Sequence, residues 1–395
     1  MRVNRAFVVA CMTGLFCTTG CSKAELADAA MRSARYPIAH HGRRVGPYEI
    51  LGGDLHCHVS PPDSPRHATR DLPATVALAE SEGLDFVVLT PHVPSRFFAD
   101  EDELSWVVET QAALAQGIAR LSPSLVVVPG FEYTDHRYGH VGAAFADLDT
   151  VLKSARPGEF RAHPERFFER WIAHGGLLTT NHPLLLPMAG SPIRELRSDM
   201  SFRGFDPKKS VPPEMAFIAT HTQTVETFNL SVTHLRDQFM IGDEERSLRQ
   251  AAHLVDRLAR EQHRKITPVG GTDSHAGWLR PTTFVLAKGR TPEAVRNAIV
   301  EGRTCVRGPE ACALEIRADG GPWKYVGDDL STEAMTVDVR TGEENATIFV
   351  NGEVAGHTAS ATTTVLVPVG RCALVRAVAG RSWSAPIYVN CSSAP

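Results

Sequence analysis

The sequence has no block of basic residues of the kind that holds nucleic acid by charge. Its 41 lysines and arginines are outnumbered by 45 aspartates and glutamates, which gives a formal net charge of -4. We therefore expect no nucleic-acid partner. A G-x-S-x-G motif is also missing, which excludes the nucleophile elbow of serine hydrolases. Beyond residue 21 no run approaches the roughly 18 apolar residues that a membrane-spanning helix needs, so no later span is expected.

The first 21 residues do not have the pattern of a folded segment. Arg2 and Arg5 make a positive start, residues 6–17 are mostly apolar, and small residues precede Cys21. This order is typical of an export signal. Its end resembles the bacterial lipobox, with a threonine three places before the cysteine where an aliphatic residue is usual. We expect an exported cell-envelope lipoprotein, anchored to the membrane through Cys21 and facing the periplasm; plain secretion is the alternative.

The remaining cysteines bear on this expectation, because export leads to an oxidising compartment in which disulfides form. Five cysteines follow Cys21, and four of them fall late in the chain. Four cysteines allow three pairings. We expect nearest neighbours to pair, Cys305 with Cys312 and Cys372 with Cys391; four buried thiols are the alternative.

Residues 48–307 alternate short apolar runs with amphipathic stretches. The apolar runs predict strands at 50–57, 86–89, 125–128, 141–145, 176–180, 225–228, 266–269 and 283–286. The stretches between them predict helices at 73–82, 101–121, 164–174 and 244–263. Strands alternating with helices of this length indicate repeated βα units on a parallel sheet. Seven or eight such units predict an α/β protein with a closed or nearly closed barrel.

Three segments depart from this alternation. Residues 22–47 are polar and predict a tether. Residues 184–222 are rich in proline and are expected to form a lid or pocket wall. Residues 308–395 carry six strand-like runs, at 314–317, 335–339, 346–350, 362–367, 373–378 and 387–389. Since no helical pattern lies between them, these runs predict a small all-β, sandwich-like domain after the barrel.

The first group of chemically active side chains lies at the end of the first predicted strand, in the sequence Asp54-Leu55-His56-Cys57-His58. In a strand, residues two apart point to the same face. His56 and His58 therefore project together and can chelate one metal, whereas Cys57 points away into packing.

Further histidines and carboxylates follow the later strands at similar offsets. They are His92, Glu132, His140, His182, Asp273 and His275. The carboxyl ends of barrel strands converge on one mouth, which is where barrel active sites lie. The sequence therefore predicts that these side chains meet in one metal cluster.

These motifs resemble those of the polymerase-and-histidinol-phosphatase (PHP) superfamily over about residues 50–307. The resemblance implies a distorted (β/α)7 barrel and three metals. One metal would be held by His56, His58, Glu132 and Asp273; Glu132 would bridge to a second, completed by His140 and His182; Asp63, His92 and His275 would hold a third. The family usually has an aspartate before the histidine at 92, where this chain has Pro91. Such a carboxylate orients a ligand imidazole.

Within the superfamily the nearest likeness is to the carbaryl-hydrolase (CehA/McbA-like) branch. Residues 291–295 and 301–304 at the end of the barrel, and the β-rich tail with residues 385–389, look like that branch. The superfamily implies phosphoesters as substrates, whereas the branch implies carbamates or carboxylic esters.

The prediction is a metal-dependent hydrolase that uses a metal-activated hydroxide, with two or three divalent ions (Zn, Mn or Fe) per chain. A phosphoesterase acting on a small-molecule ester is expected first. Carbamate or carboxylic ester hydrolysis on the same cluster is the alternative, and a non-catalytic metal-binding envelope lipoprotein is a third interpretation. Beside Glu132, Arg280 is expected to meet an anionic oxygen and His221 to donate a proton to the leaving group; a surface arginine and an ordinary loop histidine are the alternatives.

Overall fold

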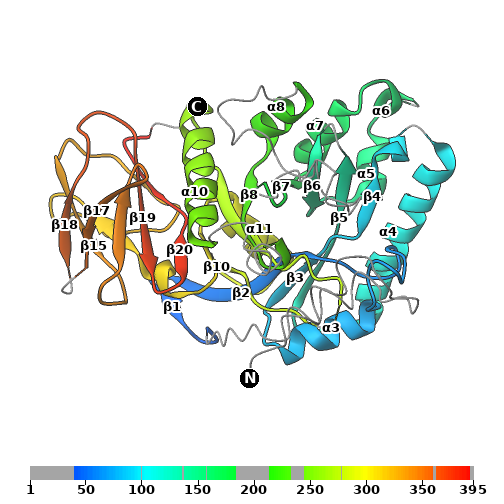
Figure 1. Ribbon diagram of the computed structural model, residues 1–395, viewed down its shortest axis with the longest axis horizontal. Helices are drawn as coiled ribbons and strands as arrows, with labels where there is room; N and C mark the ends of the chain where they lie inside the picture. Colours follow the sequence, from blue (N-terminus) through cyan, green and yellow to red (C-terminus); the bar gives the residue numbers. More distant parts are fainter. Residues whose placement is uncertain are drawn as a thin grey trace, which may run out of the picture.

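The computed structural model describes residues 40–98, 100–135, 138–156, 158–183, 213–232, 244–276, 278–358 and 362–391. The predicted export signal, most of the tether and residues 184–212 of the proline-rich segment lie outside these ranges. An α/β part and a β-rich part lie side by side (Figure 1). None of the described helices is long and apolar enough to cross a membrane.

The α/β part is built on a mixed sheet. Its neighbouring strands are, in order, β10 (Thr283–Ala287), β2 (Tyr48–Cys57), β3 (Phe86–Leu89), β5 (Val126–Asp135), β6 (Gly139–Ala144), β7 (Leu177–Thr180), β8 (Thr224–Asn229) and β9 (Thr267–Gly271). The short strands β1 (Arg44–Val45) and β4 (His92–Pro94) pair with β2 and β5. Six of the eight neighbouring strands, β2, β3, β5, β7, β8 and β9, run in one direction, so their carboxyl ends lie at one edge.

Strand β6 runs against that direction, between β5 and β7. The connection from β5 to β6 spans only residues 136–138. So short a connection joins antiparallel neighbours, because a parallel pair needs a crossover of a dozen or more residues. The amino end of β6 therefore lies at the edge where the six parallel strands end.

The mixed α/β class is confirmed, but a closed (β/α)7 barrel is not. Among the described residues, β9 and β10 form no strand ladder with each other; the Thr283 hydroxyl instead bonds the N–H and the carbonyl of Gly270, at 2.6 and 2.8 Å. An isolated parallel bridge joins Cys57 to Ser274. It brings the chain after β9 against the end of β2, which places two ligand-bearing segments side by side.

Helices cover the outer side of the sheet. They are α3 (Leu72–Ser81), α4 (Glu101–Leu121), α5 (Leu148–Lys153), α6 (Glu159–Ala162), α7 (Glu165–Ala173), α8 (Pro213–His221), α10 (Glu244–Glu261) and α11 (Pro292–Val300), with 3-10 turns at Ser95–Phe98 and Glu310–Ala313. Capping side chains fix several starts: Asp71, Asp100 and Thr291 accept backbone N–H groups in the first turns of α3, α4 and α11. The four predicted helices correspond to α3, α4, α7 and α10.

The β-rich part consists of two sheets. One has the order β13 (Lys324–Tyr325), β12 (Glu315–Arg317), β15 (Thr336–Arg340) and β18 (Thr363–Leu366). The other contains β14 (Asp329–Leu330), β16 (Thr347–Val350), β17 (Glu353–His357), β19 (Ala373–Ala379), β20 (Ser382–Ser384) and β21 (Ile387–Val389). Buried side chains of both sheets, among them Ile316, Val337, Ile348 and Val375, share one core.

The two parts of the molecule share a continuous sheet. Strand β20 pairs with β11 (Thr304–Val306), which in turn pairs with β10 of the α/β part. The division into domains at residue 307 stays a prediction. The expected disulfides are both present, Cys305–Cys312 and Cys372–Cys391, so the nearest-neighbour pairing is confirmed.

Candidate metal centre

Histidines and carboxylates gather where the six parallel strands end. His56 lies at the end of β2 and His58 just beyond it, Glu132 lies in β5, and Asp273 and His275 follow β9. His92 starts β4, His140 lies at the amino end of β6, and His182 follows β7. Asp63, in the loop after β2, contacts two of these rings. The structure thus brings all nine predicted ligand residues into one cluster.

Glu132 lies at the centre of the cluster and is only 1% exposed. Its Oε1 is 3.3 Å from His56 Nε2, 3.2 Å from His140 Nδ1 and 3.2 Å from His182 Nε2. Its Oε2 is 3.5 Å from His92 Nε2 and 3.9 Å from His58 Nε2. One carboxylate therefore faces five imidazoles that come from different parts of the sheet edge.

His56 and His58 face each other, as the alternation along a strand predicts. Their Nε2 atoms are 3.2 Å apart, and both approach Asp273 Oδ1, at 3.5 and 3.2 Å. Cys57 between them is fully buried on the other face, and burial raises the pKa of its thiol to about 12. The thiol therefore takes no part in the cluster.

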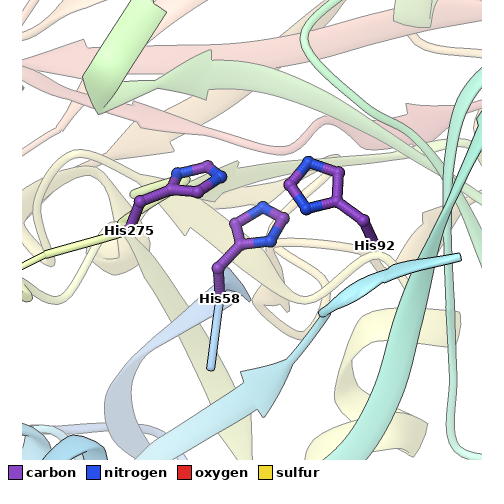
Figure 2. Close-up of side chains that lie close together, drawn as sticks. All are labelled: His58, His92 and His275. Carbon is purple, nitrogen blue, oxygen red and sulfur yellow. The ribbon is translucent and has the colours of Figure 1, made fainter. Parts of the chain in front are cut away.

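Within the cluster, three sets of side chains have ligand atoms within 4.8 Å of one another: His56, His58 and Asp273; His56, Glu132 and His182; and His58, His92 and His275. Figure 2 shows the last set, three rings that approach one another from separate segments. The His58 ring stacks on that of His275 at 3.9 Å between centroids and on that of His92 at 4.2 Å.

The arrangement fits divalent cations. The buried Nδ1 atom of His140 lies close to Glu132 but has no hydrogen-bond partner among the described residues. A cation between nitrogen and carboxylate would satisfy such an atom. Imidazole nitrogens with carboxylate oxygens are a donor set that suits Zn²⁺, Mn²⁺ or Fe²⁺, and donor type alone does not choose among them.

Two of the cluster residues have unusual backbone conformations. His182 and Asp273 have positive φ angles, 25° and 52°, which non-glycine residues seldom adopt. Hydrogen bonds hold both: the His182 N–H donates to Glu226 Oε2 at 2.6 Å, and the Asp273 N–H donates to the carbonyl of His56 at 2.8 Å. Strained backbone that the surroundings enforce is common at functional sites.

Glu226 is a site residue that the sequence analysis missed. It lies inside β8, is 2% exposed, and its Oε1 is 3.1 Å from His56 Nδ1. Its Oε2 also accepts from Asn229 Nδ2 at 3.1 Å. The available signal was a glutamate within the apolar run of a predicted strand, because a carboxylate is rarely fully buried unless it is paired.

The charges of the cluster shift the pKa values of its members in opposite directions. Burial raises the pKa of Glu132, but the imidazoles of His140 and His56 outweigh burial and hold it well below its ordinary value. Burial lowers the pKa of His56, but the carboxylates of Asp273, Glu226 and Glu132 raise it well above its ordinary value. For His275, burial and the neighbouring His58 lower the pKa to about 3. The site thus pairs ionised carboxylates with imidazoles.

Two predicted catalytic residues are not brought to the cluster. His221 ends α8, on the side where β8 begins, whereas the cluster lies where β8 ends, and its ring stacks on Phe217 at 4.0 Å. Six residues of strand separate the two ends by about 20 Å. Arg280 forms an ion pair with Glu82, just beyond α3, and donates to the carbonyl of Leu279 at 2.8 Å. We therefore give neither residue a part in the site.

Among the comparisons with known proteins, only the comparison with solved structures gives matches. No family model matches the sequence, and no curated protein matches it. A two-domain protein from Bacteroides vulgatus, containing a predicted PHP-like metal-dependent phosphoesterase, has 15% identity and a TM-score of 0.44, covering 90% of this chain and 98% of its own. A protein from Bifidobacterium adolescentis, named for the same kind of activity, has 14% identity and a TM-score of 0.33, covering 65% and 96%.

A third neighbour is endonuclease Q in complex with a 27-mer duplex that has an abasic lesion at the active site. It has 14% identity and a TM-score of 0.37, covering 63% of this chain and 56% of its own. The expectation of a small-molecule ester substrate and no nucleic acid is contradicted by this neighbour, whose structure contains a 27-mer duplex substrate. Of the neighbours described here, the protein from Bacteroides vulgatus carries the PHP name, and none carries the name of the carbaryl-hydrolase branch.

Proposed function

We propose that this protein is a metal-dependent hydrolase of ester bonds, specifically a phosphoesterase. The observation that supports this most is Glu132, a buried carboxylate that faces the imidazoles of five histidines within 3.9 Å. An arrangement of this kind suits a carboxylate shared between cations. The motifs that resemble the PHP superfamily favour phosphoesters over carboxylic esters.

Each side chain has a defined part in this proposal. The bound ions would be held by Glu132 and Asp273 together with the imidazoles of His56, His58, His92, His140, His182 and His275. When bound, divalent ions supply an activated nucleophile and polarise the scissile group. The surrounding imidazoles keep Glu132 ionised, since they hold its pKa well below its ordinary value. Asn181 fixes the same carboxylate by donating from Nδ2 to Oε1 at 2.9 Å.

Two further proposals rest on the sequence. Residues 1–21 direct the chain to the cell envelope, and residues 308–395 form an accessory β domain without chemistry of its own. Immunoblots of fractionated cells test the first, because a chain that stays in the cytoplasm would contradict it.

Substitution of Glu132 tests the proposed function. We expect Glu132→Gln to lower the turnover of an aryl phosphate by at least about 100-fold. The amide has no negative charge, so it would hold the cations more weakly than the carboxylate does. Glu109→Gln is the matched control: the same change at an exposed position of α4, for which wild-type activity is expected.

The assay compares an aryl phosphate, an aryl carboxylic ester, an aryl carbamate and an oligonucleotide. A phosphoesterase is supported if the wild type hydrolyses the aryl phosphate or the oligonucleotide and Glu132→Gln hydrolyses the same substrate more slowly. Turnover restricted to the ester or the carbamate replaces the phosphoesterase by the alternative hydrolase. Equal activity of Glu132→Gln and Glu109→Gln would overturn the site.

A further inference from the structure

Asp63 lies behind the rings of two histidines and uses both of its oxygens there. Its Oδ2 is 2.9 Å from His58 Nδ1, and its Oδ1 is 3.0 Å from His92 Nδ1. Oδ1 also accepts the backbone N–H of His92 at 2.9 Å. The side chain is 2% exposed. Three of the roughly four acceptor positions of this carboxylate are thus occupied, which leaves little capacity for a cation.

These contacts fix the tautomer of both rings. An ionised carboxylate can only accept hydrogen bonds, so Nδ1 of His58 and Nδ1 of His92 each carry a proton. The lone pair of each ring is then on Nε2. His58 Nε2 lies 3.2 Å from Asp273 Oδ1, and His92 Nε2 lies 3.5 Å from Glu132 Oε2. Both lone pairs therefore face the interior of the cluster.

Glu226 has the same relation to His56. Its Oε1 is 3.1 Å from His56 Nδ1, while His56 Nε2 lies 3.3 Å from Glu132 and 3.5 Å from Asp273. Its other oxygen accepts the backbone N–H of His182. One carboxylate thus orients a ring from β2 and also holds the strained residue after β7.

The ring of His275 is oriented in the same way, but by a backbone carbonyl and not by a carboxylate. His275 Nδ1 lies 2.9 Å from the backbone carbonyl of Asp273, which accepts a hydrogen bond from it and leaves the lone pair on Nε2. Among the described residues, the sets of side chains spaced for a cation include His58, His92 and His275 but not Asp63. The third site implied by the family resemblance would instead use Asp63.

We propose that Asp63 and Glu226 are positioning residues and not metal ligands, and that together they present Nε2 of His56, His58 and His92 to the bound cations. This inference rests on the proposed metal centre. Asp63 also replaces the carboxylate that the chain lacks at Pro91, because it orients the His92 ring from the loop after β2. A third cation would be held by imidazoles with Glu132 or Asp273.

The test measures metal binding, not activity. Wild type, Asp63→Asn and Glu226→Gln are dialysed against Zn²⁺ and Mn²⁺; the bound metal is counted by elemental mass spectrometry, and affinities are measured by competition with a chelator. Loss of a carboxylate that orients a ligand typically weakens metal affinity by about 10–100-fold. We expect both variants to reach the wild-type stoichiometry at saturating metal, with affinities reduced by that factor. Asp273→Asn, which alters a ligand, is expected to lose bound metal.

The outcomes separate this inference from the proposed function. No metal on the wild type overturns both. Metal on the wild type with one equivalent missing from Asp63→Asn makes Asp63 a ligand and overturns the inference alone, as does an unchanged affinity in both variants.

A second measurement covers the case in which a variant does not fold. Long-range ¹H–¹⁵N spectra of the Zn²⁺-loaded wild type, labelled at histidine, report which ring nitrogen carries the proton. We expect protonated Nδ1 and zinc on Nε2 for His56, His58 and His92. Zinc on Nδ1 of any of the three contradicts the proposal.

Discussion

At the candidate metal centre, single carboxylates decide which ring nitrogen His56, His58 and His92 present. A histidine that donates through Nδ1 can bind a cation only through Nε2, and the partner of Nδ1 is a carboxylate for His56, His58 and His92. The gathering of these histidines and carboxylates at one edge could be predicted, because they recur at the ends of successive strands. The partners could not, because Glu226 belongs to the interior of a strand and Asp63 to a loop.

Closeness in sequence to a cluster residue predicted the place of a side chain less well than position at the end of a strand. Arg280 follows His275 by five residues, yet it pairs with Glu82. His221 lies shortly before β8, but the direction of the strand carries the chain away from it toward the cluster. A sequence shows the order of residues along a strand but not the partner of a side chain outside it. The structure therefore does not support a catalytic part for His221 or Arg280.

Asp85, which lies away from the cluster, is predicted to stabilise the fold in a pH-dependent way. The buried carboxylate accepts from the N–H of Gly52 at 2.9 Å and from Arg290 at 2.7 Å, and pairs with His40 at 2.8 Å. Burial alone raises the pKa of Asp85, but these partners together lower it below its ordinary value. The stabilisation is therefore fully present above the unfolded-state pKa of about 4 and is lost as the pH falls through the folded-state pKa.

We expect Asp85→Asn to lower the free energy of unfolding by about 1–3 kcal/mol at pH 7, because a buried donor loses its acceptor. The difference from wild type should shrink when urea unfolding is repeated at pH values falling from 5 to 3. Asp319→Asn, at an exposed position, serves as the control. A difference that stays constant or grows toward pH 3 would contradict the assignment.

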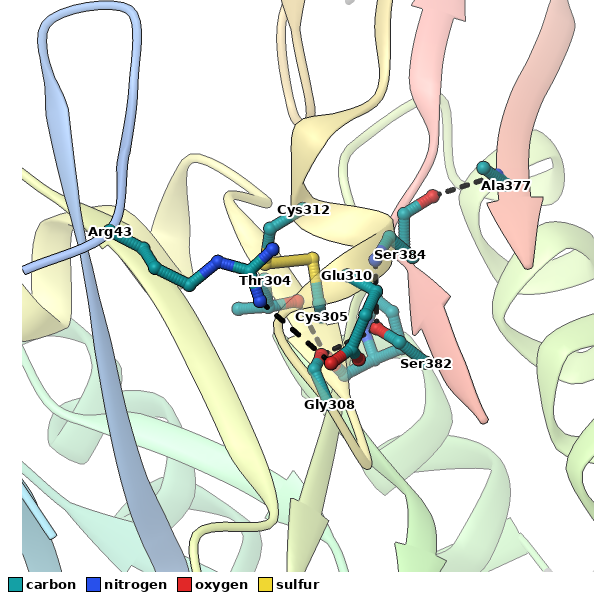
Figure 3. The surroundings of a disulfide bond; sticks show 11 residues. Arg43, Thr304, Cys305, Gly308, Glu310, Cys312, Ala377, Ser382 and Ser384 are labelled. Atoms are coloured by element: carbon teal, nitrogen blue, oxygen red, sulfur yellow. Dashed lines mark hydrogen bonds and ion pairs between the residues drawn. A yellow bond between two sulfur atoms is a disulfide. The ribbon is translucent and has the colours of Figure 1, made fainter. Parts of the chain in front are cut away.

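At the scale of elements, the antiparallel strand β6 interrupts the expected repeat of βα units, while the missing ladder between β9 and β10 leaves the sheet open among the described residues. The alternation of strands and helices predicted the strands correctly, but a connection of three residues between β5 and β6 allows only a hairpin. The junction between the two parts of the molecule could not be predicted from the sequence either. Figure 3 shows it around the disulfide Cys305–Cys312, where Arg43, just before β1, forms an ion pair with Glu310, with 3.8 Å between Nη1 and Oε1.

An ion pair between α10 and β19 joins the same two parts. Asp256 and Arg376 are 1% and 2% exposed and lie in contact. Removal of one member of a buried pair typically costs about 3–5 kcal/mol, because the other charge is left without a partner, whereas replacement of both by apolar residues costs less. We expect Arg376→Met to lower the free energy of unfolding by about that amount, and Arg376→Met with Asp256→Leu to be more stable than the single variant. Guanidinium unfolding of the three proteins measures this, and a double variant less stable than Arg376→Met would refute it.

At the scale of the whole molecule, the cluster joins chain segments that are distant in the sequence. Its residues lie between 56 and 275, and the bridge from Cys57 to Ser274 places the last of them beside the first. Cations bound there would hold the strand ends together. Binding to the folded state alone adds stability that increases with metal concentration.

The central claim is that these side chains hold divalent cations around Glu132, and the metal content of the purified wild type tests it most directly. Elemental mass spectrometry of the metal-replete protein, with Glu132→Gln and Glu109→Gln beside it, is the measurement. The account predicts at least two divalent ions per chain in the wild type and in Glu109→Gln, with fewer in Glu132→Gln. A wild type without stoichiometric metal, or a Glu132→Gln protein that keeps the full complement, would contradict it.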